Sequence, residues 1–125
     1  MRHTAKKLFT TTFSLAAVIG ALLLASFPAS AADGASVIEK GKAVSFDRKK
    51  GNCLACHAMG DGTLPGNIGP PLIAMKARFP DKAKLRAQIW DATVANPNSI
   101  MIPFGRNRVL SEEEIDLVVE YVYSL

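Results

Sequence analysis

Apolar and polar side chains follow one another along the chain with the spacing of short helices rather than of strands. Little of the sequence alternates apolar with polar residues, so strands are not expected to dominate. Four segments instead have one apolar face at helical spacing. They span residues 35–48, 72–79 and 82–93, with a last segment that begins at Ser111. The pattern predicts an all-α fold of three to four short helices.

Capping residues stand near the starts of these segments. Asp81 can cap the third segment, and Asp33 or Ser36 could cap the first. Ser111 and Glu114 form an S-x-x-E capping box at the start of the last segment. The helices are therefore expected to begin close to these residues.

Two irregular stretches separate the predicted helices. Residues 60–71 contain four glycines and three prolines, which exclude a helix or a central strand there. Residues 96–107 form a second irregular loop, which holds Pro97, Met101, Pro103 and Gly105. A chain of 125 residues with this much loop has room for one domain and a thin core.

The first 31 residues have the composition of a secretory signal peptide. Three basic residues come first, followed by the apolar run 13–25 and the small-residue cleavage site Ala29-Ser30-Ala31. An uncleaved membrane anchor is the less favoured alternative, because the apolar run is shorter than the ~20 residues that span a bilayer. We expect residues 1–31 to be a signal peptide, cleaved near Ala31, and residues 32–125 to be one exported domain.

Removal of the leader changes the charge of the chain. The whole sequence has 15 basic and 11 acidic residues, a net charge of +4. Without Arg2, Lys6 and Lys7 the remaining 94 residues keep 12 basic and 11 acidic ones, a net charge of +1. A nearly neutral exported domain is a poor candidate for nucleic-acid binding, which depends on neutralising phosphates.

The sequence contains two cysteines, and a histidine follows the second. Cys53, Cys56 and His57 form C-x-x-C-H, the attachment sequence of c-type haem. Cysteines one turn apart can form thioethers to two vinyl groups of one porphyrin, and the next residue can bring its imidazole to the iron. Zinc would need four ligands, a thioredoxin-like pair would need a βαβ context, and a disulfide would leave His57 without a role. We expect one covalent haem c, and a poorly folded chain without it.

The second axial ligand of the iron has few candidates. His57 is the only histidine after the leader, so the options are methionine, lysine or an open site. Met59 lies too near His57 to reach the opposite face, and Met75 is expected in apolar packing. Met101 is the favoured ligand, because its irregular loop can fold over the haem edge. The carbonyl of Pro70 is the expected acceptor for the other ring nitrogen of His57.

These residues resemble the class I cytochrome c family. The resemblance rests on the C-x-x-C-H motif, the Gly-Pro-Pro-Leu stretch at 69–72, the loop of Met101 and the final helix. It implies that the first and last helices cross, with a glycine and aromatic residues at the contact. Gly41, Phe46 and Tyr121 could serve there. Gly41 is expected to let a helix or the cofactor approach closely, or else to be a tolerated helix glycine, and Trp90 is expected to pack against the haem.

A closer resemblance, over nearly all of the chain after the leader, is to the SoxX family, the monohaem subunits of the sulfur-oxidation cytochrome SoxAX. It is carried by residues 48–58, 69–72, 85–93, 96–98 and 101–108. The methionine of that family is commonly followed by two prolines, and Ile102 replaces the first of them here.

The resemblance to the SoxX family implies a specific function. A SoxX subunit pairs in the periplasm with a haem-containing SoxA subunit, and the complex joins thiosulfate oxidatively to a cysteine of the carrier SoxYZ. The catalytic haem, with its modified cysteine ligand, belongs to SoxA, and this chain has no third cysteine for such a ligand. It is therefore expected to have no catalytic residue, to accept electrons from SoxA and to pass them to a soluble cytochrome.

Two other functions remain open. A free monohaem carrier would have the same haem-binding residues, and a haem sensor or peroxidase would have an open iron site. Five basic residues could dock acidic partners, pair with haem propionates or be plain solvated charge. They are Arg48, Lys49, Lys50, Arg106 and Arg108.

Overall fold

The computed structural model of the protein describes residues 30–125. The predicted signal peptide, residues 1–31, therefore lies almost entirely outside the described residues. Within the described range the only β-pairing is an isolated bridge between Met59 and Leu72. The elements are α1 (Ser30–Phe46), the 3-10 helix η1 (Cys53–Ala55), α2 (Met75–Arg78), α3 (Lys82–Trp90) and α4 (Glu112–Tyr123). The predicted all-α fold is confirmed.

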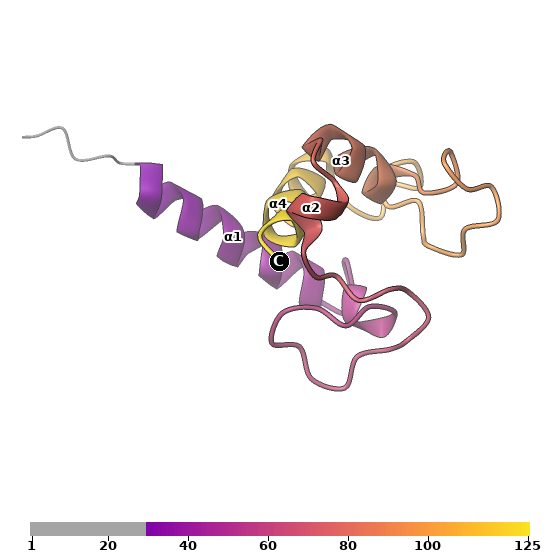
Figure 1. Ribbon diagram of the computed structural model, residues 1–125, viewed down its shortest axis with the longest axis horizontal. Helices are drawn as coiled ribbons and strands as arrows, with labels where there is room; N and C mark the ends of the chain where they lie inside the picture. The colour runs from indigo at the N-terminus through magenta and orange to yellow at the C-terminus, as the bar shows by residue number, and fades with distance from the viewer. Residues whose placement is uncertain (1–29) are drawn as a thin grey trace, which may run out of the picture.

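Helices α1 and α4 cross at the centre of the molecule (Figure 1). Gly41 of α1 lies so close to α4 that a Cβ atom there would stand 2.0 Å from the carbonyl oxygen of Leu117. Beside this contact the rings of Phe46 and Tyr121 meet edge to face, with centroids 6.0 Å apart. Ser45 is fully buried, and its hydroxyl donates to the carbonyl of Gly41 at 2.8 Å. Gly41 thus permits the approach of a helix, one of the two partners expected of it.

Helix α3 packs on the other side of α4 and completes the core. Leu85 and Ile89 of α3 join one buried cluster with Ile115, Val118 and Val122 of α4. Exposed ion pairs link the same two helices on their outer side: Arg86 with Glu112 and Asp116, and Lys82 with Glu120. Exposed pairs of this kind contribute little, about 0–1 kcal/mol each, so the apolar cluster is what stabilises the contact.

Two long loops project from the helical core (Figure 1). Residues 56–74 connect η1 to α2, and residues 91–111 connect α3 to α4. The end of the first loop is tied to the end of the chain, because the N–H of Met75 donates to the carbonyl of Leu125 at 2.9 Å. No helix among residues 30–125 has the length and apolar character needed to cross a membrane.

Two helix ends differ from the sequence prediction. Helix α1 begins at Ser30, so neither Asp33 nor Ser36 caps it. Helix α3 stops three residues before the expected end at 93. The Asp91 carboxylate there accepts hydrogen bonds from the N–H and the hydroxyl of Thr93. Such a local side-chain turn competes with the next turn of helix and ends it.

The short helix α2 and the capping residues can be compared with the prediction in the same way. Helix α2 is shorter than expected and starts only after Ala74, which has a positive φ of 51°. The side chain of Asp81 accepts from the N–H of Ala83 at 2.9 Å, as a cap of α3 should. Ser111 and Glu114 make both hydrogen bonds of the capping box at the start of α4. Both of these predicted caps are confirmed.

Candidate haem-binding site

The core and the two loops enclose a cavity of about 630 Å³. This volume lies within the range of about 300–1,000 Å³ that is typical of cofactor and ligand pockets. The loop walls come from residues in 48–57, 68–72 and 96–102. The core side is formed mainly by the apolar side chains of Leu85, Ile89, Phe104, Leu110, Val118 and Val122, together with Arg78 and Gln88.

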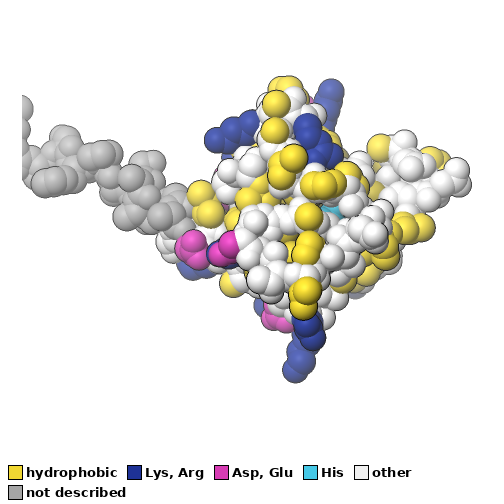
Figure 2. All heavy atoms as spheres, turned by 60° about the horizontal axis from the view of Figure 1, so that its bottom comes forward, with side chains coloured by type: hydrophobic (Ala, Val, Ile, Leu, Met, Phe, Trp, Pro, Cys, Tyr) yellow, Lys and Arg dark blue, Asp and Glu magenta, His cyan; other side chains and the backbone are white. Residues whose placement is uncertain are grey.

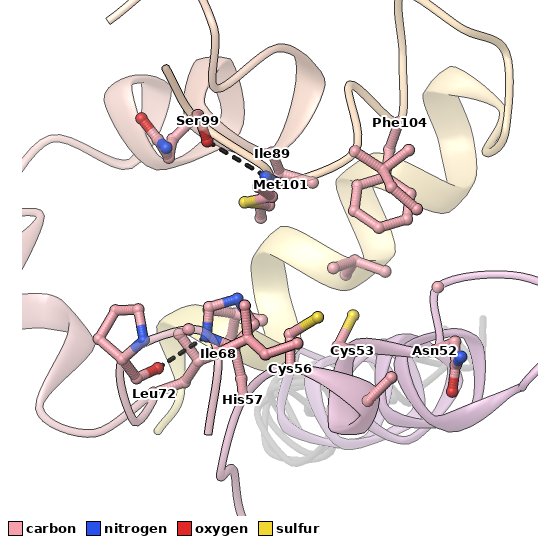
Figure 3. Close-up of a pocket in the computed structure, with 18 of the residues that line it drawn as sticks. Asn52, Cys53, Cys56, His57, Ile68, Leu72, Ile89, Ser99, Met101 and Phe104 are labelled. Atoms are coloured by element: carbon pink, nitrogen blue, oxygen red, sulfur yellow. Dashed lines mark hydrogen bonds between the residues drawn. The ribbon is translucent and has the colours of Figure 1, made fainter. Parts of the chain in front are cut away.

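The C-x-x-C-H segment is one tight turn at the edge of this cavity. Asn52 has a positive φ of 46°, and η1 begins directly after it. The N–H of His57 donates to the carbonyl of Cys53 at 2.9 Å, which closes the turn. Figure 3 shows both cysteine sulfurs and the imidazole at the same wall of the cavity. Gly51 lets the chain before this turn lie close to α1, since a Cβ atom there would stand 2.8 Å from the carbonyl oxygen of Val44.

The two cysteines of the turn are free and half-buried. Burial raises the pKa of the Cys53 thiol to about 11, so this thiol is neutral at physiological pH. Within residues 30–125, no three His, Cys, Asp or Glu side chains come together as a metal site would require. Both sulfurs of the turn are available for thioether bonds.

His57 is oriented by two contacts on one side of its ring. Its Nδ1 lies 2.7 Å from the carbonyl oxygen of Pro70, so the predicted hydrogen bond is present. A carbonyl can only accept, so Nδ1 carries the proton and Nε2 keeps a free lone pair. Gly69 packs against the ring so closely that a Cβ atom there would lie 2.3 Å from Cε1. An imidazole held in this way is ready to bind a metal through Nε2.

Met101 lies on the opposite wall of the same cavity (Figure 3). The side chain is half-buried, and the N–H of Met101 donates to the hydroxyl of Ser99 at 3.2 Å. The structure therefore brings Met101 across from Cys53, Cys56 and His57, although 44 residues separate it from the histidine in sequence.

The other two methionines of the described chain are core residues. Met75 is 1% exposed and Met59 is 4% exposed. Met75 borders the cavity, but its sulfur accepts a hydrogen bond from Nη1 of Arg78 at 3.4 Å. Met59 does not line the cavity. Both side chains thus have a packing role, which the sequence favoured for Met75.

Trp90 does not line the cavity, so the expectation that it packs against a haem is wrong. Its indole N–H donates to Glu112 at 2.9 Å. Its ring lies against Gly105, where a Cβ atom would stand 2.0 Å from Cδ1. Trp90 instead joins the end of α3 to the start of α4. An aromatic residue on an apolar helix face carries no information about which neighbour will cover it.

The mouth of the cavity exposes apolar side chains. Ile68, Ile100 and Ile102 line the cavity and are 63%, 79% and 50% exposed. Figure 2 shows the histidine of the described chain among hydrophobic side chains on one face of the molecule, with basic side chains nearby. This face is apolar at its centre.

The five basic residues noted in the sequence differ in their surroundings. Lys50 pairs with Glu114, and Arg106 pairs with Asp91 at 2.7 Å. The other three are exposed and form no ion pair with any residue that the structure describes: Arg48, Lys49 and Arg108. Two of the five therefore form ion pairs within the fold, and the other three basic side chains can face a partner.

Several residues that shape the site were not predicted from the sequence. Gly51 provides the space beside α1 and Gly69 the space beside the ring of His57. The available signals were that Gly51 lies two residues before the motif and that Gly69 directly precedes Pro70. The buried carboxylate of Asp91 gave no signal, because no motif in the sequence marks Arg106 as its partner.

The residues of this cavity fit a haem c. Two thiols one turn apart and an imidazole with a free nitrogen stand on one wall, and a thioether sulfur stands across an apolar space of adequate volume. This is the donor set of a c-type cytochrome. The fold and the site together define the class as an all-α c-type cytochrome domain.

Comparison with known proteins agrees with this class. A family model described as cytochrome c oxidase, cbb3-type, subunit III matches residues 30–122, which are 93 of the 125 residues. The chain therefore belongs to this family of c-type cytochrome domains, which supports haem c binding and electron transfer. A relative named "Uncharacterized lipoprotein" in Aquifex aeolicus (strain VF5) is 38% identical over 77 residues. The match covers 60% of this chain and 37% of that protein, so the chain spans little more than a third of its relative.

Proposed function

We propose that this domain is the electron-accepting, SoxX-type subunit of a periplasmic SoxAX complex. Membership of the family of c-type cytochrome domains supports the general role, an electron-transfer domain with haem c. The specific role as a SoxX-type subunit is supported by the resemblance of residues 48–58, 69–72 and 101–108 to the SoxX family. In this function the complex conjugates thiosulfate to a cysteine of SoxYZ, and this chain supplies no catalytic residue.

The proposal depends above all on the arrangement of side chains across the cavity. Cys53 and Cys56 would hold one haem c as thioethers, with His57 and Met101 as its axial ligands from opposite walls. The carbonyl of Pro70 keeps Nε2 of His57 free for this role. When bound, the haem iron accepts and gives up single electrons. With His57 and Met101 both bound to the iron, the site would leave no position for a substrate, which would suit a carrier.

The side chains around the cavity would favour the reduced, ferrous state of a bound haem. A neutral thioether ligand raises the reduction potential relative to a second imidazole. The apolar core side, which includes Leu85, Ile89 and Phe104, disfavours the extra positive charge of the ferric state. Both effects act in the direction that an electron acceptor needs.

The mouth of the cavity suits the docking of a partner such as the SoxA subunit or a soluble cytochrome. Exposed Ile68, Ile100 and Ile102 offer apolar contact at the edge of the site. Arg48 and Lys49 add positive charge beside it. An acidic surface with an apolar centre on either partner would complement this face and speed the encounter.

Export supports a periplasmic location for this function. The sequence has the features of a cleavable signal peptide at residues 1–31. The relative in Aquifex aeolicus is named a lipoprotein, which is consistent with a protein that leaves the cytoplasm. We propose the periplasm for this chain on these two grounds.

A free monohaem carrier is the second candidate function. The matched family is described from a subunit of a terminal oxidase, which favours electron delivery in respiration. The haem-binding residues would be the same, so the two candidates differ only in their partner. An open-site sensor or peroxidase, the third possibility, would require that Met101 not bind the iron.

Copurification with a SoxA-type subunit from the same genome tests the proposed function. The haem-loaded chain should form a stable heterodimer with it, and replacing Arg48 and Lys49 by glutamine should weaken the association at low salt. Lys84→Gln, on the exposed side of α3, is the matched control and should have no effect. A chain with a normal haem spectrum that does not associate would favour the free carrier. A ferric spectrum without the far-red sulfur-to-iron band, with rapid binding of carbon monoxide, would favour the open site.

A further inference from the structure

The loop that carries Met101 is fastened at its base by a buried carboxylate. The side chain of Asp91 is 3% exposed, although it is charged. Its Oδ1 accepts from the N–H of Thr93 at 2.9 Å and from the Thr93 hydroxyl at 2.5 Å. Its Oδ2 accepts from Nη1 of Arg106 at 2.7 Å. Nη1 of Arg106 also donates to the Thr93 hydroxyl at 3.0 Å, so the three side chains form one connected network.

This network joins the two ends of one loop. Asp91 and Thr93 directly follow α3, while Arg106 lies after the segment that contains Met101. Backbone contacts strengthen the same closure, since the N–H groups of Gly105 and Arg106 both reach the carbonyl of Trp90, at 3.1 and 3.4 Å. We call this closure the loop base, formed by residues 90–93 and 103–106.

Beyond the loop base, the side chain of Met101 packs against the core, but the backbone of residues 94–102 makes no hydrogen bond outside its own loop. Val94 and Ile100 are 81% and 79% exposed. The backbone N–H groups of this segment that make hydrogen bonds donate only within residues 91–99. The segment projects from the helices in Figure 1. The backbone of this segment, and with it the position from which Met101 reaches the cavity, is therefore fastened to the helices through the loop base.

We infer that Asp91, with Thr93 and Arg106, is a positioning residue that holds Met101 on the cavity wall opposite His57. This inference rests on the proposed role of Met101 as the axial ligand. Asp91 does not line the cavity and would not touch the haem, so it acts only through the loop. The backbone at Met101 depends more on this network because Ile102 follows Met101, and isoleucine does not fix the backbone angle φ as proline would.

A competition experiment with added imidazole tests this inference in the haem-loaded chain. Asp91→Asn keeps the shape of the side chain and removes the charge that Arg106 and Thr93 contact. It should lose the far-red sulfur-to-iron band at about tenfold lower imidazole concentration than the wild type. Its reduction potential should also fall, while the covalent haem and the helical circular dichroism stay unchanged. Asp61→Asn is the matched control, because Asp61 forms an exposed pair with Lys42 outside the loop base.

The possible outcomes separate this inference from the proposed function. If Asp91→Asn and Asp61→Asn resist imidazole as the wild type does, Asp91 has no positioning role and the inference is overturned. If the wild type itself lacks the far-red band, the Met101 ligand and the inference both fail. If Asp91→Asn does not fold, Arg106→Gln replaces it, since Arg106 is half-exposed. A wild-type response in folded Arg106→Gln would also overturn the inference.

Discussion

The two loops that face each other across the cavity are held in different ways. Loop 56–74 returns to the turn that it leaves: Gly66 donates to Leu54, and Gly69 to Cys56, each at 2.8 Å. Loop 91–111 is tied to the helices at its base, and the segment that carries Met101 makes hydrogen bonds only within this loop. The loop beside His57 is thus a compact local structure, whereas the loop that carries Met101 is fastened only at the loop base.

This difference predicts different consequences of change on the two sides. Contacts of loop 56–74 with the turn that it leaves hold His57, so damage there should affect haem attachment and folding together. Contacts that form only in the folded chain, such as Asp91 with Arg106 and Trp90 with Glu112, hold Met101. Damage there should change the sixth ligand and the reduction potential while the helices remain.

Loss of both cysteines should have the largest effect. Cys53→Ser with Cys56→Ser removes the covalent bonds on the histidine side, and the core that remains is small. We expect the free energy of unfolding to fall by at least about 4 kcal/mol, the stabilisation from a ligand at roughly a thousand times its Kd. Urea titration followed by circular dichroism measures this. Unfolding of the double variant at the wild-type urea concentration would mean that the chain folds without haem.

Removal of the methionine should change the spectrum far more than the stability. Met101→Ala should abolish the far-red band, lower the reduction potential and allow carbon monoxide to bind. Because Met101 is half-buried, the loss of stability should stay below about 2 kcal/mol. Met75→Leu is the control, with an unchanged spectrum and a loss under about 1.5 kcal/mol. The reverse result for the two variants would assign the ligand to Met75.

A pair of glycine substitutions compares the two sides directly. Gly69→Ala places a methyl group 2.3 Å from the ring of His57, and Gly105→Ala places one 2.0 Å from the ring of Trp90. Each should destabilise the chain by about 1–3 kcal/mol through overpacking. Gly69→Ala should reduce the yield of attached haem, whereas Gly105→Ala should mainly weaken the far-red band. If both variants changed the yield of attached haem and the far-red band equally, the two loops would not differ in how they hold His57 and Met101.

The smallest effect on stability should come from acidification, which protonates a carboxylate at the start of α4. The hydrogen bond from Lys50, with that from the Ser111 N–H, lowers the pKa of Glu114 below its ordinary value of 4.5. When the pKa of a carboxyl group is lower in the folded than in the unfolded chain, the ionised group stabilises the fold at pH values above its unfolded pKa. This stabilisation is lost as the pH falls through its folded pKa. Stability should therefore decline below about pH 4.5.

Glu114→Gln tests the origin of this decline. It should lower the stability at neutral pH by less than about 1 kcal/mol, because glutamine keeps the capping hydrogen bond and only the exposed pair with Lys50 is lost, and it should flatten the decline in acid. Glu113→Gln, exposed on the same turn, should keep the wild-type pH dependence. A Glu114→Gln profile parallel to that of the wild type would show that another group titrates.

The parts of the molecule that could be predicted from sequence are those that depend on neighbours along the chain. The C-x-x-C-H turn and the capping box need only a few consecutive residues. The contact of His57 with Pro70 spans a rigid loop rich in glycine and proline, so spacing was enough to suggest it. The all-α fold followed from periodicity, because each helix buries one face.

The parts that could not be predicted depend on which surfaces meet after folding. The early end of α3 results from Asp91, whose side chain bonds to Thr93 and is held by Arg106 from the far side of the loop. Trp90 could have covered the cavity or the helix contact, and only the fold decides between them. The helix glycine at 41 had the same ambiguity between a helix and a cofactor.

The intact mass of the purified protein tests the central claim most directly. We expect one added haem, carried after digestion by the peptide that contains residues 53–57, in a protein whose ferric form shows the far-red sulfur-to-iron band. A polypeptide with the mass of its amino acids alone would contradict this claim, because Cys53, Cys56 and His57 would then have no haem to hold.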